Sequence, residues 1–121
     1  TIKVFAAGQS GGGRYPNMEI LVNDRVVATY TGVADLREYS YSYSSRLQPQ
    51  NVKVRLSNDY YTAPWDDRNL RVDKINIDGV DYQSESQNSY STGTWSSGTG
   101  CNPGNKQSEW LHCNGYLRFG Q

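Results

Sequence analysis

The stretch MEILVNDRVVATY, from Met18 to Tyr30, decides the fold class of this 121-residue chain. Two β-rich runs, Met18–Val22 and Arg25–Tyr30, flank Asn23 and Asp24, a pair that tolerates the positive φ of a tight turn. The stretch therefore predicts a β-hairpin.

Further strand patterns lie on both sides of this hairpin. Tyr39, Tyr41 and Tyr43 alternate with serines, so the three rings should lie on one face of a strand. Other predicted strands cover Thr1–Ala7, Val52–Leu56, Val72–Ile77 and Tyr116–Phe119, whereas the glycine-rich run Ala7–Asn17 predicts a loop. Short strands with turn signals about every 8–12 residues predict an all-β protein, a β-sandwich jelly roll. We expect residues 1–121 to form one module.

The composition indicates a binding domain with a neutral partner. Twelve Lys and Arg balance twelve Asp and Glu, so the basic excess that attracts nucleic acid or an anionic membrane is missing. No run approaches the roughly 18 apolar residues of a membrane span. Ten Tyr, three Trp and two Phe in a polar background are typical of all-β domains that meet polar, flat ligands. We expect a monomer without a nucleic-acid or membrane partner.

The two cysteines, Cys101 and Cys113, enclose a short loop and predict a disulfide. Zinc is the alternative, but only His112 lies close enough in sequence to join the pair. A disulfide indicates a secreted, extracellular protein, because such bonds persist in oxidising compartments. It would also hold Glu109 and Trp110 in a loop that can wall a binding site; the alternative, which we favour, is that the bond only staples a long loop.

The segment SNDYYTAPWDDRNLRVD, from Ser57 to Asp73, is the most unusual part of the chain. It places Asp59, Asp66 and Asp67 near a predicted turn. Neighbouring carboxylates repel one another, and a hard cation such as Ca²⁺ relieves that repulsion while accepting oxygen ligands. The alternative is a set of solvated turn carboxylates with Arg68 as their ion-pair partner.

Tryptophans provide the other candidate contacts. Trp65, Trp95 and Trp110 fall in predicted loops or at strand ends, where an exposed indole can stack on a sugar ring. Packing in the core is the alternative for each, and Trp65 is the best candidate for the surface.

Enzyme activity is not expected. Glu85 and Glu109 could be drawn as the paired carboxylates of a glycosidase, but nothing in the sequence places them together. A serine hydrolase would have to use His112, and no G-x-S-x-G turn accompanies it.

Three stretches resemble a known family: ND…WDDRNLRVDKINIDG, with GGGRYPNMEILVNDRVVA upstream and YQSESQNSYSTGTW downstream. They resemble the calcium-dependent xylan-binding carbohydrate-binding modules of family 60, which are circularly permuted relatives of family 36. The D-R-N-L-x-V-D run is the most specific part. The resemblance implies a noncatalytic β-sandwich jelly roll that holds an attached, secreted glycoside hydrolase on xylan or a related β-glycan.

The resemblance also implies two calcium ions. A functional ion that coordinates sugar O2 and O3 is expected at Asp59 and at the Trp65-Asp66-Asp67 step, including the backbone carbonyl of Trp65. The family pattern has one Asp before Arg-Asn-Leu where this chain has two, so either Asp66 or Asp67 is the ligand. A structural ion is expected at Asp73, Gln83 and Glu85, with Gln83 in place of an acidic residue.

Sugar contacts are expected from Asp59, Tyr60, Trp65, Asp66 and Trp110. The alternative function is a metal-independent β-sandwich lectin in which calcium is only structural. Its aromatic platform could be the stripe of Tyr39, Tyr41 and Tyr43.

Overall fold

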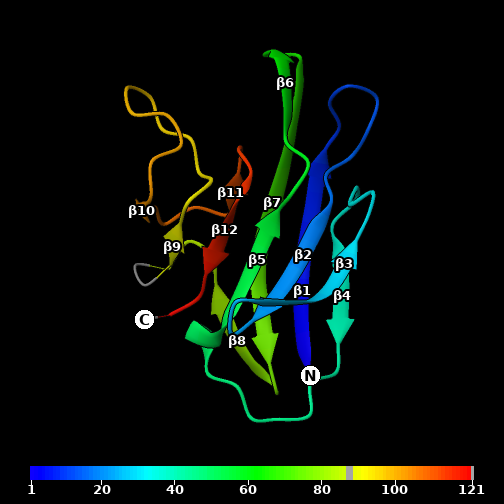
Figure 1. Ribbon diagram of the computed structural model, residues 1–121, viewed down its shortest axis with the longest axis vertical. Coiled ribbons are helices and arrows are strands. Elements are labelled where there is room, and N and C mark those ends of the chain that lie inside the picture. Colours follow the sequence, from blue (N-terminus) through cyan, green and yellow to red (C-terminus); the bar gives the residue numbers. More distant parts are fainter. Residues whose placement is uncertain (87–88, 121) are drawn as a thin grey trace.

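The computed structural model describes residues 1–86 and 89–120 and contains two antiparallel β-sheets that share one apolar core (Figure 1). The strands are β1 (Ile2–Gln9), β2 (Met18–Val22), β3 (Arg25–Tyr30), β4 (Arg37–Tyr41), β5 (Val52–Leu56), β6 (Tyr60–Ala63), β7 (Asp66–Ile77), β8 (Val80–Gln83), β9 (Tyr90–Ser91), β10 (Gly104–Asn105), β11 (Trp110–Leu111) and β12 (Gly115–Arg118). One sheet has the order β11-β7-β1-β4, with β6 and β8 also paired to β7. The other has the order β10-β9-β12-β5-β2-β3.

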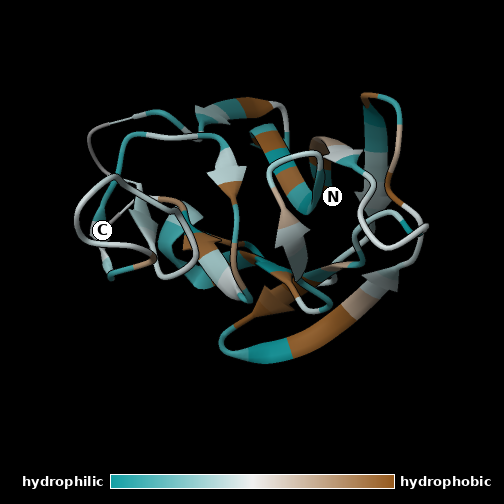
Figure 2. Ribbon diagram, turned by 90° about the horizontal axis from the view of Figure 1, so that it is seen from above, coloured by the Kyte–Doolittle hydropathy of each residue, from teal (hydrophilic) through white to brown (hydrophobic). Residues whose placement is uncertain are grey.

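The core fills the space between the two sheets. Val4 of β1, Val54 of β5 and Leu117 of β12 are among its fully buried residues. In Figure 2 the alternation of apolar and polar residues appears as bands along strands. This alternation buries one side of each sheet, and the predicted all-β sandwich is confirmed.

The predicted hairpin is also confirmed. Strands β2 and β3 have the predicted bounds, and Asn23 and Asp24 adopt φ values of 50° and 65° between them. The only helical element among residues 1–86 and 89–120 is the 3₁₀ turn η1 (Pro49–Asn51). Within the same residues, no helix has the length and hydropathy of a membrane span.

The tyrosine stripe lies against the core. Tyr39 is buried, and the half-buried Tyr41 and Tyr43 pack against the same apolar cluster. The prediction of one strand through all three residues is wrong at its end, because β4 stops at Tyr41. A metal-independent platform on these rings is therefore not supported.

The segment around Asp66 is a hairpin and not a loop. Strand β7 begins at Asp66, earlier than predicted, and pairs with β6 across a turn formed by Pro64 and Trp65. Asp and Pro disfavour strands, but pairing with β6 and β1 outweighs that local preference.

A β-bulge divides β7 at Asp73. Along β1 the partner of Phe5 is Lys74, whereas the partner of Ala6 is Val72, so Asp73 has no partner residue in β1. The extra residue changes which face each side chain occupies, as β-bulges do. This explains why two inward-facing residues, Val72 and Ile75, are three positions apart.

Candidate functional site

A pocket of about 560 Å³, called the first pocket below, lies between the β6–β7 hairpin and the loop that the disulfide closes. The predicted Cys101–Cys113 disulfide is present. Pairing of β11 with β7 brings this loop beside the hairpin. The lining residues are Asp59, Tyr61, Pro64, Asp67, Trp95, His112 and Cys113.

Asp59 carries an unpaired acceptor in this pocket. Among residues 1–86 and 89–120 its buried Oδ1 has no hydrogen-bond partner, while its backbone N–H donates to Asn114 Oδ1 at 2.7 Å. Burial raises the pKa of the Asp59 carboxyl and the charge of Asp67 raises it further, whereas a hydrogen bond from the Tyr60 backbone and the charge of Arg68 oppose this shift. A buried carboxylate oxygen without a donor is costly, and an oxygen-seeking cation would relieve that cost.

Asp67, and not Asp66, shares the first pocket with Asp59. The carboxylate of Asp66 accepts hydrogen bonds from the backbone N–H of Gly12 and from the hydroxyl of Thr62, both at 2.7 Å. These two hydrogen bonds lower the pKa of Asp66. Successive strand residues point to opposite faces, which separates the two neighbouring carboxylates.

Arg68 fixes the backbone around this acidic pair. Its buried guanidinium donates to the carbonyl oxygens of Gly11 at 2.7 Å, Asn58 at 2.6 Å and Arg14 at 3.1 Å, and lies 5.2 Å from the ring centre of Tyr60. These contacts join the glycine-rich loop to the segment that carries Asp59. Its hydrogen bonds go to carbonyl groups, and its positive charge also lowers the pKa of Asp59 and of Asp66. The alternative in which Arg68 is the charge partner of these carboxylates therefore stays open.

The predicted aromatic contacts lie in different places. Trp65, at the hairpin turn, is 88% exposed and lines a second pocket, of about 300 Å³, which shares Pro64 and Asp67 with the first. Tyr60 lies beside the Arg68 guanidinium, and Trp110 stacks on His112 with ring centres 6.1 Å apart. Neither Tyr60 nor Trp110 lines either of the two pockets.

The segment before the disulfide loop contributes Trp95, a candidate sugar contact in the sequence, and the loop contributes His112, which the sequence did not indicate as a pocket residue. His112 Nδ1 accepts the backbone N–H of Trp95 at 2.9 Å, so in the neutral ring the proton lies on Nε2. Burial lowers the pKa of His112, although Asp67 opposes that shift. His112 is the chain's single histidine and adjoins Cys113, which was its only sequence signal.

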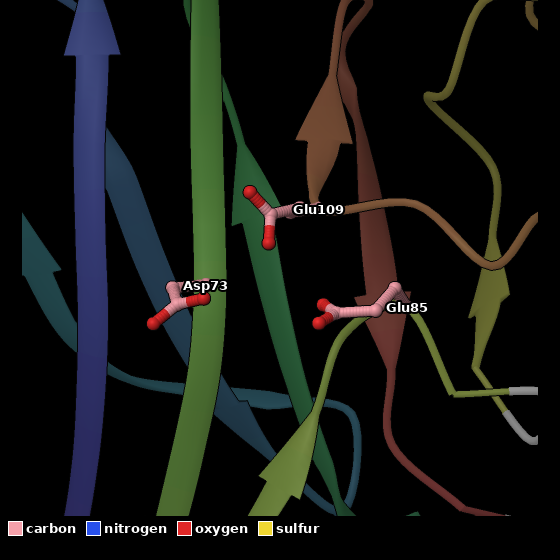
Figure 3. Close-up of side chains that lie close together, drawn as sticks. All are labelled: Asp73, Glu85 and Glu109. Atoms are coloured by element: carbon pink, nitrogen blue, oxygen red, sulfur yellow. The ribbon is translucent and has the colours of Figure 1, made fainter.

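A second acidic cluster lies on the edge of β7. Carboxylate oxygens of Asp73, Glu85 and Glu109 lie within 4.8 Å of one another (Figure 3). Strands β11 and β8 pair with β7 on either side of the Asp73 bulge, which brings Glu109, before β11, close to Glu85, after β8. Three carboxylates this close favour a bound divalent cation, because Ca²⁺ accepts several such oxygens.

Arg71 is the cationic neighbour of this cluster. It forms an ion pair with Glu109, and this hydrogen bond together with the nearby carboxylate charges raises the pKa of Arg71. Gln83 ends β8, where its carbonyl accepts the backbone N–H of Ser86 at 3.3 Å. Glu109, which the sequence did not indicate as a metal ligand, completes the acidic set.

Glu85 and Glu109 thus lie together, although nothing in the sequence placed them so. Neither residue lines the first or the second pocket.

The chain is similar to known proteins along most of its length. Residues 1–92 match the family model CBM60, described as a Ca-dependent carbohydrate-binding module, xylan-binding. The chain is 34% identical over 119 residues to the endo-1,4-beta-xylanase Xyn11B of Cellvibrio japonicus. That alignment covers 98% of this chain and 30% of the relative, so the chain spans less than a third of the xylanase.

Two solved structures are similar along nearly the whole chain. One is vCBM60 in complex with galactobiose, with 33% identity and a TM-score of 0.74, covering 98% of this chain and 96% of that one. The other is the selenomethionine form of vCBM60, described with a circular permutation that links two families of calcium-dependent carbohydrate-binding modules. It has 34% identity and a TM-score of 0.77, covering 98% of this chain and 88% of that one. The chain therefore belongs to CBM60, the family of Ca-dependent, xylan-binding carbohydrate-binding modules.

Proposed function

We propose that this protein is a noncatalytic module that binds xylan or a related β-linked glycan through calcium held in the first pocket. The observation that carries this proposal is the buried Asp59 Oδ1, which has no partner within the described part of the chain and lies in a pocket shared with a second carboxylate, Asp67. Oxygen donors of this kind suit Ca²⁺ better than zinc. Family membership and the glycan-bound relative support the same function.

Asp59 and Asp67 would hold the functional ion. Trp65, whose backbone carbonyl the resemblance also implies as a ligand, lines the neighbouring second pocket. A bound calcium ion supplies positive charge and coordination positions for sugar O2 and O3. The remaining contacts fall to the walls of the pocket, where Trp95 and Tyr61 are exposed and offer ring faces. His112 Nε2–H is a further donor for a sugar hydroxyl.

Glycan binding should depend on calcium. We expect EDTA to abolish retardation of the protein in an affinity gel containing soluble xylan, and added CaCl₂ to restore it. Retardation that persists in EDTA would instead support the metal-independent lectin. New reducing ends after incubation of the pure protein with xylan would contradict a noncatalytic role.

A second, structural calcium ion is proposed at Asp73, Glu85 and Glu109. Replacing Glu85 and Glu109 together by alanine should lower the melting temperature in CaCl₂ by about 5 °C or more, because a ligand that binds only the folded state stabilises it. The matched control is Glu38→Ala, an exposed carboxylate of β4. Binding of xylan at low temperature should survive in the double variant. Loss of binding without loss of stability would reverse the roles of the two acidic sites.

The wider setting of the module is part of the same proposal. The xylanase relative, three times longer than the matched region, supports an attached glycoside hydrolase that the module holds on its substrate. The disulfide supports secretion. We propose residues 1–121 as one monomeric module.

A further inference from the structure

A cluster of two tyrosines and two cations, called the outer patch below, lies on the sheet that contains β5, β9 and β12. Its members are Lys53, Tyr90, Tyr116 and Arg118. Their neighbours along these strands are buried in the core, so the four side chains point to the opposite, outer face of the sheet. The described residues that line the two pockets include none of the four.

Strand pairing brings the members of the outer patch together. Arg118 lies between Lys53, its partner on β5, and Tyr90, its partner on β9. The rings of Tyr90 and Tyr116 have centres 6.4 Å apart. Lys53 Nζ lies 4.3 Å from the ring centre of Tyr116, and the Arg118 guanidinium lies 4.7 Å from that of Tyr90. The attraction between a cation and a ring face holds both cations against the sheet.

Arg118 is the member of the outer patch whose charge no carboxylate balances. Lys53 forms an ion pair with Asp24, and the neighbouring Arg55 forms one with Glu19 at 2.7 Å. Among residues 1–86 and 89–120, no ion pair includes Arg118, and its buried Nε has no hydrogen-bond partner. Arginine side chains bind carboxylates through two parallel N–H groups. The outer patch is therefore complementary to one added carboxylate.

The tyrosine rings beside Arg118 restrict the kind of anion that fits. Tyr90 and Tyr116 are half-buried, so both rings remain in part accessible. Aromatic rings of this kind offer an apolar surface to the C–H groups of a sugar. A ligand that has both a carboxylate and such C–H groups matches the cation and the rings at once.

We propose that the outer patch is a second carbohydrate site, which binds an acidic sugar of the uronic acid class. The sugar carboxylate accepts hydrogen bonds from the Arg118 guanidinium, and the sugar ring contacts Tyr90 or Tyr116. This site uses no calcium and lies on another part of the molecule than the first pocket, so it goes beyond the proposed function. A glycan with uronic acid side groups can then be bound at two places on the module.

An NMR titration of the parent protein in CaCl₂ tests this proposal. The probes are methyl β-glucuronide, its neutral counterpart methyl β-glucoside, and acetate. The glucuronide should shift the backbone resonances of Tyr90, Tyr116 and Arg118, and about 0.5 M NaCl should weaken that binding by about fivefold or more through screening. The glucoside lacks the charge and acetate lacks the sugar ring, so each should bind at the outer patch at least about fivefold more weakly than the glucuronide.

Arg118→Gln should weaken glucuronide binding at the outer patch by about tenfold, because the amide carries no charge. Arg118→Lys keeps the charge but not the paired N–H groups, and should lose less. The matched control is Arg46→Gln, which removes an exposed arginine of the loop before η1 and should change this binding by less than about twofold.

Three results overturn the inference: equal binding of glucuronide and glucoside at the outer patch, equal binding of glucuronide and acetate there, or unchanged glucuronide binding in a folded Arg118→Gln variant. The comparison of probes uses the parent protein, so it decides the matter even if Arg118→Gln does not fold. Loss of the proposed calcium site affects resonances of the first pocket and not those of the outer patch, so the two proposals fail separately.

Discussion

Asp67→Asn should lower the affinity of the protein for soluble xylan by about 100-fold or more in CaCl₂, an effect that only Asp59→Asn should equal among single carboxylate variants. The reason is that Asp67 lines the same pocket as Asp59, whose buried Oδ1 has no hydrogen-bond partner among the residues that the structure describes. Replacing the carboxylate by an amide removes the negative charge that retains the cation. Isothermal titration with soluble xylan in CaCl₂, and again in EDTA, measures the difference.

Asp66→Asn is the matched control for this variant. The Asp66 carboxylate is occupied by Gly12 and Thr62, so its amide variant should bind xylan within about threefold of the parent protein. Asp59→Asn should behave like Asp67→Asn and remain folded by near-ultraviolet circular dichroism. Loss of binding in Asp66→Asn with binding retained in Asp67→Asn would show that the metal ligand was assigned to the wrong neighbour.

Arg68→Met should lower the free energy of unfolding by about 3 kcal/mol, because the buried carbonyl groups that it satisfies lose their donors. Those carbonyls belong to Gly11, Arg14 and Asn58, on two separate segments of the chain. Urea denaturation followed by tryptophan fluorescence measures the change. Xylan binding should weaken as well, because Asn58 immediately precedes Asp59.

The control for Arg68→Met is Arg25→Met, which removes an exposed arginine of β3. An exposed substitution of this kind should change stability by no more than about 0.5 kcal/mol. If the two variants lose the same small amount of stability, the carbonyl groups around Arg68 have found other donors and the proposed anchoring role is wrong.

The local sequence pattern was sufficient to predict the position of those strands in which apolar and polar side chains alternate regularly. The hairpin around Asn23 and Asp24 has the bounds that its sequence predicts, as does β5. Strand β7 was recognised only in part, since its first residues are acidic and a bulge interrupts its alternation at Asp73. The early start of β7 and its bulge both depend on pairing with other strands, and a local sequence pattern does not predict such pairing.

The candidate sites, too, could be predicted from the sequence only in part. Charge pattern and family resemblance together indicated Asp59 and the Asp66-Asp67 step, but only the register of the β6–β7 hairpin separates Asp67 from Asp66. His112 and Glu109 reach their sites because the disulfide loop docks on β7 through β11. Contacts between segments so far apart in sequence have no signature in composition or spacing.

The bulge in β7 has a further consequence for how this sequence can change. If Asp73 is left out, Leu70, Val72, Ile75 and Ile77 alternate without interruption with Arg71, Lys74 and Asn76. The hydrophobic frame of the strand therefore does not need Asp73. A single-codon insertion or deletion at this point can add or remove a carboxylate without turning the core residues toward solvent.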